Sequence, residues 1–241
     1  WYTRWAKQCD QLCRVPECLT AQGEANEYLI VLEDLQEAGY SVVKRHVKID
    51  DVNVCLRWLA NFHAAFLGQV PEGLWEVGTY WHLDTRPDEL KVLDDASLKQ
   101  AAAAIDARLN ACEFQTFVHG DAKLANFNFT TQGDDVAAVD FQYVGGGCGM
   151  KDVAYFIGSC FDETQCEKLE DQLLNTYFTY LDEAVKSKNI TVDFKALEHE
   201  WRAMFPLAWT DFHRFIKGWS PGHWKIHDYS ERLAKKVLAN L

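Results

Sequence analysis

Residues 117–140 constrain the fold of this chain more than any other segment, because they contain two short apolar runs separated by a turn. The turn, residues 131–135, contains one glycine and two aspartates, and its flanking runs are aromatic or β-branched. Such a pattern predicts an antiparallel β-hairpin. Centring the hairpin on Gly133 places Asn126 opposite Asp140, and facing residues in antiparallel strands lie about 5 Å apart.

These facing residues predict a metal site. The amide oxygen of Asn126 and the carboxylate of Asp140 suit Mg²⁺, which takes few protein ligands and shares the rest with phosphates and water. Asp121 lies five residues before Asn126, so a short loop can bring both to one point. A carboxylate there can accept the proton of an attacking alcohol, and Lys123 can neutralise charge on a transferred phosphoryl group. The segment therefore predicts phosphoryl transfer.

Charge and composition exclude several classes of partner. The 241 residues contain 24 Lys and Arg against 36 Asp and Glu, which gives a net charge of −12. This balance argues against sequence-independent nucleic-acid binding and against a polybasic membrane anchor, while it permits a cationic or polar small molecule. No apolar run approaches about 18 residues, and no basic segment precedes an apolar one at the N-terminus. We therefore expect a cytoplasmic protein with no membrane partner.

The eight cysteines are scattered and form no Cys-x-x-Cys pair or zinc-finger spacing. Cys9, Cys13 and Cys18 form the densest group, but their spacing does not favour zinc. We expect reduced thiols in a cytosolic protein.

Apolar periodicity predicts a small β-containing N-terminal part and a large helical body, with a boundary near residues 36–40. In the N-terminal part, the pattern predicts the end of a helix over 1–13, a strand over 15–21, a turn at 22–24 and a buried strand over 27–33. In the body, it predicts helices over 51–67, 97–112, 163–187, 193–216 and 225–240. Ser97 is the expected N-cap of the second of these helices.

The spacing His-x-Asp-x-Lys-x-x-Asn, from His119 to Asn126, matches the catalytic loop of protein kinases, and the Asp-Phe that begins at Asp140 stands where that family has Asp-Phe-Gly. His-Gly-Asp at 119–121 and Asp-Phe-Gln at 140–142 resemble the kinase-like small-molecule phosphotransferases. These include aminoglycoside phosphotransferases, choline kinases and the ecdysteroid-kinase-like group, and Asp-Phe-Gln is most similar to the last.

Three further segments carry the same resemblance in the expected order. Residues 28–35 resemble the last strand of the kinase N-lobe as it runs into the hinge. Residues 58–64, Trp-Leu-Ala-Asn-Phe-His-Ala, resemble a C-lobe helix that ends in Leu-His-Ala. Residues 151–155, Lys-Asp-Val-Ala-Tyr, resemble the Asp-Leu-Ala segment whose aspartate braces the catalytic loop. The resemblance extends from about Val15 to Phe161.

The resemblance implies an α+β, protein-kinase-like fold, with a partial N-lobe over 1–35, a hinge at 36–40 and a helical C-lobe over 41–241. It implies ATP-dependent, in-line transfer of the γ-phosphoryl group, with Mg²⁺, to a hydroxyl of a small-molecule alcohol. In this interpretation Asp121 orients or deprotonates the hydroxyl, Lys123 contacts the phosphoryl group, and Asn126 and Asp140 hold Mg²⁺.

The resemblance also suggests supporting roles. Backbone groups around Glu33 and Leu35 would meet adenine. His119 would support the catalytic loop rather than exchange protons, and Asp152 would act as a scaffold carboxylate. The identity of the acceptor and the oligomeric state stay open.

The phosphate-covering loop, strand lysine and helix glutamate of the family have no candidate before Tyr28, where Lys7 is the sole lysine. We therefore expect a chain that begins inside the N-lobe or has lost ATP binding in the usual form. The alternative function is that of a pseudokinase, or of an inactive kinase-like fragment that binds a ligand without turnover. A protein kinase is disfavoured by Gln142 in place of glycine and by the lack of an Ala-Pro-Glu segment.

Two other patterns leave alternatives. The glycine-rich residues 145–149 lack the Lys-Ser/Thr of a P-loop, so we expect flexible backbone near the acceptor, and no base is tied to Cys148 to make it a nucleophile. The C-terminal aromatic residues favour core packing, and the alternative is an aromatic pocket that binds a quaternary ammonium group. They are Trp201, Phe205, Trp209, Phe212, Phe215, Trp219, Trp224 and Tyr229. Asp211 and His213 lie among them.

Overall fold

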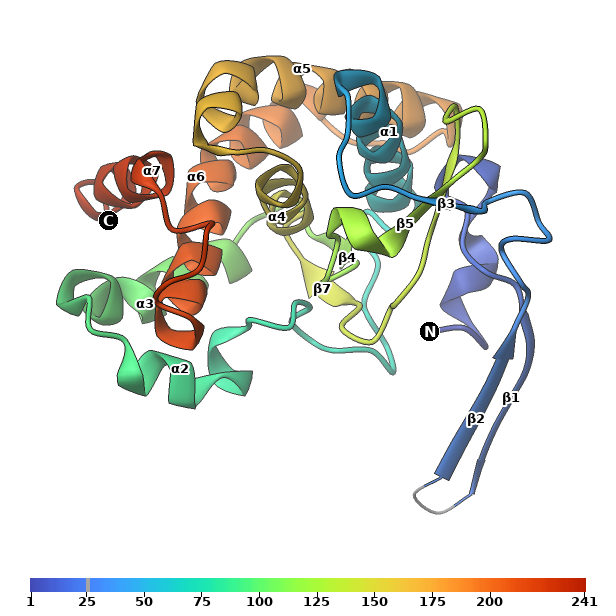
Figure 1. The fold of residues 1–241 in the computed structure, drawn as a ribbon, viewed down its shortest axis with the longest axis horizontal. Coiled ribbons are helices and arrows are strands. Elements are labelled where there is room, and N and C mark those ends of the chain that lie inside the picture. Colours follow the sequence, from blue (N-terminus) through green and yellow to red (C-terminus); the bar gives the residue numbers. More distant parts are fainter. Residues whose placement is uncertain (25–26) are drawn as a thin grey trace.

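The structure is a computed structural model that describes residues 1–24 and 27–241. One β-hairpin projects from a mostly helical body (Figure 1). The hairpin consists of the antiparallel strands β1 (Cys18–Glu24) and β2 (Glu27–Leu32), and two short 3-10 helices precede it, η1 (Trp5–Gln8) and η2 (Gln11–Cys13). The predicted α+β class with a large helical part is confirmed.

The body contains α-helices of very different length. They are α1 (Ile49–Ala65), α2 (Pro87–Val92), α3 (Ala96–Asn110), α4 (Met150–Cys160), α5 (Glu163–Ser187), α6 (Phe194–Trp219) and α7 (Asp228–Leu238), with a 3-10 turn η3 (Leu83–Thr85) before α2. Helix α1 packs on α5, and α6 packs on α4, α3 and α7. Within the described ranges, no helix is both long and apolar enough to cross a membrane.

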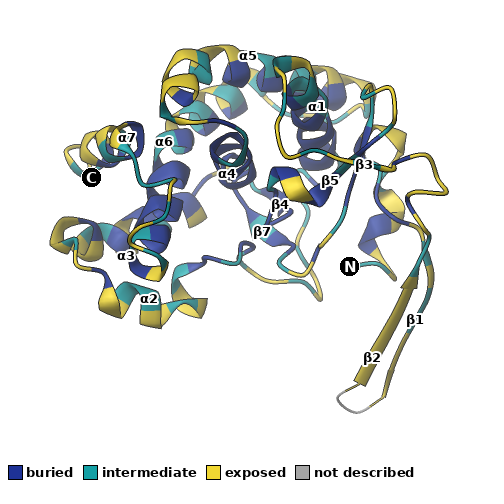
Figure 2. Cartoon of the chain, in the orientation of Figure 1, coloured by how far each residue is buried: buried dark blue, intermediate teal, exposed yellow. Residues whose placement is uncertain are grey.

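Helix α5 occupies the predicted range. Asp162 and Gln165 form a capping box at its start, where each side chain accepts a backbone N–H of the other. Leu173, Tyr177 and Leu181 are completely buried along one face, as the apolar spacing predicts. Figure 2 shows this buried face turned toward α1 and the centre of the body.

Helix α1 lies two residues earlier than its predicted range of 51–67, and α6 extends three residues beyond its predicted end. The starts of α3 and α7 also differ from the prediction, and capping side chains explain both. Helix α3 begins at Ala96 rather than Ser97, because Asp95 accepts a hydrogen bond from the backbone N–H of Leu98 at 3.0 Å. Helix α7 begins at Asp228 rather than at residue 225, because the ring of His227 accepts from the N–H of Ser230. Residues 225–227 therefore belong to a loop.

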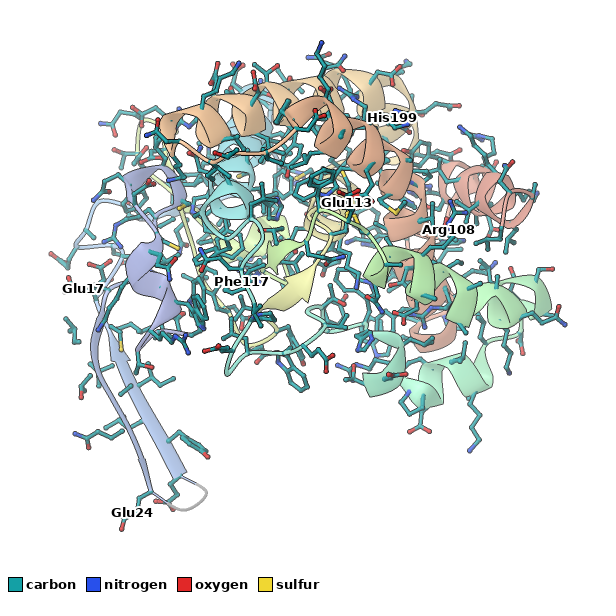
Figure 3. The ribbon with its side chains drawn as sticks, turned by 180° about the vertical axis from the view of Figure 1, so that it is seen from behind. Glu17, Glu24, Arg108, Glu113, Phe117 and His199 are labelled. Carbon is teal, nitrogen blue, oxygen red and sulfur yellow. The ribbon has the colours of Figure 1, made fainter. Side chains whose placement is uncertain are left out.

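The N-terminal part differs from its prediction in four ways. Residues 1–13 form 3-10 turns rather than the end of an α-helix. Strand β1 begins at Cys18 rather than at residue 15, and residues 22–24 continue it instead of turning. Strand β2 exists but is exposed, with Tyr28 at 79%, because the ribbon has two strands and projects from the body. Figure 3 shows Glu17 just before this ribbon, Glu24 at its far end and Phe117 inside the body. The predicted boundary at 36–40 stays a prediction.

The predicted hairpin after the catalytic loop exists, but its register is wrong by one residue. Strands β5 (Phe127–Phe129) and β6 (Val136–Ala138) pair, with β3 (Val42–Val43) on the other edge of β5. The turn closes where the N–H of Thr130 donates to the carbonyl of Asp135 at 3.1 Å, which leaves four residues in the loop instead of five. Asn126 therefore faces Val139, whose N–H donates to the Asn126 carbonyl at 3.0 Å, and not Asp140.

The glycine-rich segment is not flexible backbone, because it forms a packed strand. Strand β7 (Gly145–Gly147) pairs with β4 (Thr116–Val118), which leads into the catalytic loop. A Cβ atom on Gly145 would lie 2.8 Å from the Cβ of Trp75 and 2.9 Å from the backbone nitrogen of Gly78. Glycine is needed here because a neighbouring backbone approaches too closely for any side chain.

Candidate active site

Asp121 lies three residues after β4, and 4% of its surface is exposed. Its Oδ2 accepts hydrogen bonds from Lys123 Nζ at 2.6 Å and from Asn126 Nδ2 at 3.1 Å. Its Oδ1 accepts one from the hydroxyl of Tyr155 at 3.1 Å. The structure thus brings three of the predicted residues together, and three donors fix the direction of the carboxylate.

Asn126 and Asp140 are the predicted metal ligands. Asn126 ends η4 (Leu124–Asn126), and its amide nitrogen also donates to the Asp121 carbonyl at 2.8 Å, so the amide oxygen is the atom left for a cation. Asp140 is exposed, and its φ of 68° is uncommon for a residue with a side chain. Burial and the negative charge of Asp140 together raise the pKa of Tyr2 to about 12, and burial contributes more.

An amide oxygen and a carboxylate are hard-oxygen ligands of the kind that Mg²⁺ combines with phosphate oxygens. The donor chemistry of Asn126 and Asp140 therefore fits a phosphate-bound magnesium ion, although the strand register does not set them directly opposite each other. In the described part of the chain, no three His, Cys, Asp or Glu side chains gather where they could hold a metal.

His119 has hydrogen bonds that suit a neutral ring. Its Nε2 donates to the Val139 carbonyl at 2.9 Å, and its Nδ1 accepts from the backbone N–H of Asp121 at 3.2 Å. Complete burial lowers the pKa of His119, which keeps the ring in the neutral form that this pattern needs. The ring joins the catalytic loop to the strand that ends before Asp140, which are the contacts that a supporting role requires.

Asp152 projects from α4 onto the backbone of the catalytic loop and is completely buried. Its Oδ2 accepts from the N–H of His119 at 2.6 Å, and its Oδ1 accepts from the N–H of Gly120 at 3.0 Å. The Nε2 of His63 in α1 lies 3.1 Å from the same Oδ2, and the Nδ1 of His63 lies 2.7 Å from the hydroxyl of Tyr177 in α5. One carboxylate therefore connects the loop to three helices.

Gly120 allows the loop to turn between His119 and Asp121. It has a φ of 81°, and a Cβ atom there would lie 2.8 Å from the backbone nitrogen of Thr79, besides colliding with the carbonyl of Tyr143. We expect Gly120→Ala to lower the free energy of unfolding by about 3 kcal/mol or more, because the strained backbone and the overpacking add.

Urea unfolding measures this loss. Gly222→Ala is the matched control, because a Cβ atom at Gly222 meets nothing within 4 Å, and we expect its stability to stay within about 0.5 kcal/mol of wild type. Equal stability of the two variants would contradict the strained geometry at Gly120.

A cavity of about 660 Å³ opens beside Asp121 and Lys123. Side chains from distant segments form its walls, and six of them are aromatic: Tyr80, Tyr143, Tyr155, Phe212, Trp219 and Trp224. Burial raises the pKa of Tyr80 to about 12 and raises that of Tyr155 further, so both hydroxyls stay protonated and can donate. A cavity of this size and apolar lining is typical of a small-molecule site.

The C-terminal aromatic residues divide between the core and this cavity. Trp201 and Phe205 are completely buried in the main core, as the default interpretation expects, whereas Phe212, Trp219 and Trp224 line the cavity. Neither Asp211 nor His213 lines it. Asp211 instead pairs with Arg214 at 2.8 Å and accepts from Trp81.

The sequence did not indicate Tyr80, Tyr143, Tyr155 or Lys225 as residues that line the cavity. Tyr155 is the one with a usable signal, because it ends the Lys-Asp-Val-Ala-Tyr segment and lies three residues after Asp152 on α4. The others come from loops, which carry no periodicity.

The structure does not bring the predicted adenine contacts to this cavity. The N–H of Glu33 donates to the carbonyl of Glu17 at 2.9 Å, and its side chain pairs with Arg14. Leu35 is buried against Tyr40, and its carbonyl accepts from the N–H of Tyr40 at 2.8 Å. Contact between adenine and these residues stays a prediction.

Similar folds occur among solved structures of small-molecule kinases. The amicoumacin kinase in complex with AMP-PNP, Ca²⁺ and its ligand has a TM-score of 0.53 at 12% identity, covering 94% of this chain and 71% of that chain. The microcompartment-associated aminopropanol kinase has a TM-score of 0.51 at 14% identity, covering 95% and 73%. At such low identity, the similarity shows a common fold. A choline/ethanolamine kinase family protein from Mesorhizobium loti has a TM-score of 0.49 at 17% identity, covering 98% and 78%.

Among curated proteins, none matches this sequence significantly. The family model described as the ecdysteroid kinase-like family matches residues 4–69 and 77–190, which is well over half of the chain. The match includes the helix that carries His63, the whole catalytic loop and the Asp152 segment. This chain belongs to the ecdysteroid kinase-like family.

Proposed function

We propose that this chain is a small-molecule kinase, which transfers the γ-phosphoryl group of ATP to a hydroxyl of a small-molecule alcohol with the help of Mg²⁺. The observation that carries the proposal is the Asp121 carboxylate, which three donors orient at the wall of a cavity large enough for such an acceptor. Family membership and the kinases with a similar fold support the same reaction class.

In the proposed mechanism, the acceptor lies in the aromatic cavity with its hydroxyl toward Asp121. Because Tyr155 and Asn126 both donate to the carboxylate, Asp121 is held in one orientation and can take the hydroxyl proton as the oxygen attacks phosphorus. Lys123 lies within reach of the same point and would shift from Asp121 toward the incoming phosphate. His119 and Asp152 hold the backbone of the loop.

Asn126 and Asp140 would hold the magnesium ion, which when bound neutralises charge on the phosphate oxygens. The phosphate groups of ATP complete such a site, since two protein oxygens are too few for octahedral coordination. We further propose that the adenine lies against the backbone near Glu33 and Leu35, as the resemblance to kinases implies.

The proposal is tested by transfer of labelled phosphate from ATP, with Mg²⁺, to a panel of alcohols: an ecdysteroid, streptomycin, amicoumacin and 1-amino-2-propanol. These compounds represent the family name and the ligands named for proteins with this fold. Phosphorylation of any of them supports the proposal. Binding of ATP and Mg²⁺ in calorimetry without transfer to any alcohol would instead favour a pseudokinase.

Asp140→Asn is expected to raise the Mg²⁺ concentration needed for half-maximal transfer and to lower kcat/KM for ATP about 100-fold, because one of two protein ligands loses its charge. Asp94→Asn, at another exposed loop aspartate, is the matched control and should leave both values unchanged. The same Mg²⁺ dependence in both variants would remove Asp140 from the metal site.

A further inference from the structure

Lys225 lies in the cavity beside Asp121 and has no role in the proposed transfer. Its Nζ lies 4.5 Å from the centre of the Tyr155 ring, 5.1 Å from that of Phe212 and 5.7 Å from that of Trp224. These three side chains are called the aromatic cage below. The hydroxyl of Tyr155 donates to Asp121, so the cage adjoins the reacting centre directly.

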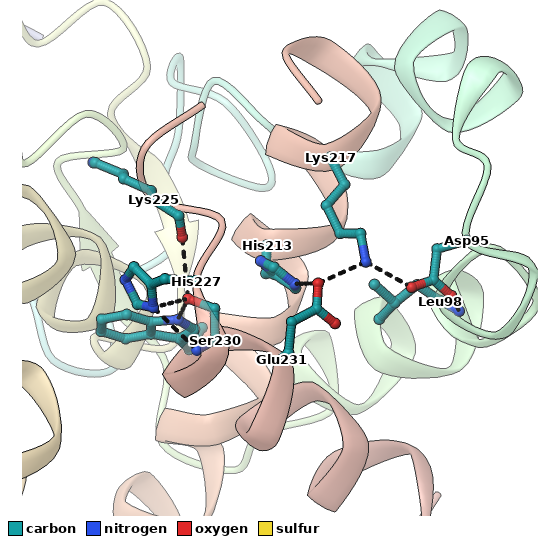
Figure 4. Close-up of polar contacts among 9 residues, drawn as sticks. Asp95, Leu98, His213, Lys217, Lys225, His227, Ser230 and Glu231 are labelled. Carbon is teal, nitrogen blue, oxygen red and sulfur yellow. Dashed lines mark hydrogen bonds and ion pairs between the residues drawn. The ribbon is translucent and has the colours of Figure 1, made fainter. Parts of the chain in front are cut away.

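The ammonium group of Lys225 has aromatic neighbours instead of a counter-ion. Lys217, eight residues earlier, pairs with Asp95 and Glu231 at 2.8 Å each, whereas no such pair involves Lys225 within the described residues. Figure 4 shows this difference, because the Lys217 side chain lies between two carboxylates and that of Lys225 lies apart from them.

The backbone of Lys225 is fixed from the opposite side. The hydroxyl of Ser230 donates to the Lys225 carbonyl at 3.2 Å, and the indole N–H of Trp209 donates to the same hydroxyl at 3.0 Å. In Figure 4 the Lys225 side chain extends away from this anchor. These two hydrogen bonds hold the backbone of Lys225 in place, and its side chain then extends from this fixed position into the cage.

The charge in the cage is compatible with neutral pH. Burial lowers the pKa of Lys225 to about 8, the charge of Lys123 acts in the same direction, and the Asp121 carboxylate opposes them, so the ammonium form predominates at pH 7. Ring faces attract a cation through their quadrupole. Here the protein supplies that cation itself, and a second ammonium group at the same rings would be repelled by the first.

We propose that Lys225 determines acceptor specificity: its ammonium group occupies the aromatic cage, excludes acceptors that would place an ammonium group there, and donates a hydrogen bond to an oxygen of an uncharged or anionic alcohol. The role of Lys225 in the choice of acceptor rests on the proposed kinase function, whereas the exclusion of cations from the cage does not. The net charge of −12 would by itself permit a cationic acceptor. At the cage, the ammonium group of Lys225 has the opposite effect and repels such an acceptor.

Tetramethylammonium is a suitable probe, because it is a cation that fits between aromatic rings and cannot react. We expect the Lys225→Ala chain to bind it at least tenfold more tightly than wild type, measured by tryptophan fluorescence and calorimetry at pH 7. Lys225→Arg keeps the cation and should bind it as weakly as wild type. Lys235→Ala, at an exposed lysine of α7, is the matched control for loss of a charge.

Lys225→Met is a second variant that removes the charge but keeps an aliphatic stem against the rings. A gain of binding in either the Ala or the Met variant supports the proposal. The proposal is wrong if neither variant binds tetramethylammonium more tightly than wild type while circular dichroism shows that both variants are folded.

Transfer assays separate this inference from the proposed function. 1-Amino-2-propanol and 1,2-propanediol differ by an ammonium group in place of a hydroxyl. Wild type should favour the diol, and Lys225→Ala should shift the ratio of kcat/KM toward the amine at least tenfold, with the KM for ATP unchanged. A ratio that does not move contradicts the proposal. If wild type phosphorylates neither compound, the kinase function is decided by the full panel of alcohols, and the tetramethylammonium titration still decides the role of Lys225.

Discussion

Asp121→Asn is expected to lower kcat for phosphoryl transfer by about 10²- to 10⁴-fold, which is the usual contribution of a positioned general base. Asparagine has nearly the same shape, and its oxygen can still accept a hydrogen bond from Lys123 or Tyr155. It cannot take the proton of an attacking hydroxyl, and it does not balance the charge of Lys123. The loss should therefore appear in kcat, while the KM for ATP changes less than threefold.

The measurement compares steady-state transfer with the unfolding midpoint in urea, so that loss of activity is not confused with loss of fold. Asp171→Asn, at an exposed position of α5, makes the same chemical change away from the cavity and should leave kcat unchanged. If Asp121→Asn retained kcat within threefold of wild type, Asp121 would not be the base, and the proposed mechanism would fail at its first step.

Elements with one apolar face were predictable from the sequence. Helix α5 begins and ends as predicted because Leu173, Tyr177 and Leu181 repeat at helical spacing and Asp162 provides a cap. The cluster around Asp121 was also predictable, because Lys123 and Asn126 lie within one short loop that cannot separate them. Local sequence therefore determines the centre of the candidate site.

Features that depend on one residue of register or on packing were not predictable. The hairpin turn closes at Thr130 and Asp135 through a single backbone hydrogen bond, and this shift moves Asp140 away from Asn126. Helix α4 was not predicted because residues 150–158 are all buried, including the polar Lys151 and Asp152, so it lacks the solvent-facing polar side that marks a surface helix. The predicted burial of β2 was wrong because its continuous apolar run, residues 28–32, does not reveal whether another element covers the strand.

The cavity wall was the least predictable part of the site. Tyr155 and Lys225 lie 70 residues apart in sequence, and they meet in a fold in which α6, which precedes the Lys225 loop, packs against α4, which carries Tyr155. The sequence around Lys225 contains no motif that indicates a function for a lysine in a loop between two helices. The inference about Lys225 depends on the aromatic rings around it, which come from α4, α6 and the same loop.

Asp152→Ala is expected to lower the free energy of unfolding by about 3–5 kcal/mol, because it leaves three buried donors without their acceptor. The donors are the backbone N–H groups of His119 and Gly120 and the Nε2 of His63, all within 3.1 Å of this carboxylate. Tyr177→Phe removes only the hydrogen bond between the Tyr177 hydroxyl and His63, which is the one farthest from the loop in this series. We expect it to lower the free energy of unfolding by about 1–2 kcal/mol. Urea unfolding of both variants gives the two values directly.

Asp182→Ala is the control, because Asp182 forms an exposed pair with Lys186 on α5, and such pairs contribute at most about 1 kcal/mol. An Asp152 variant as stable as this control would mean that water or a neighbouring group replaces the carboxylate. The order of the three losses also tests how the catalytic loop is held. If Tyr177→Phe lowers kcat as well as stability, the position of Asp121 depends on α5 through His63 and Asp152. If it lowers stability alone, the two backbone hydrogen bonds to Asp152 are sufficient to hold the loop.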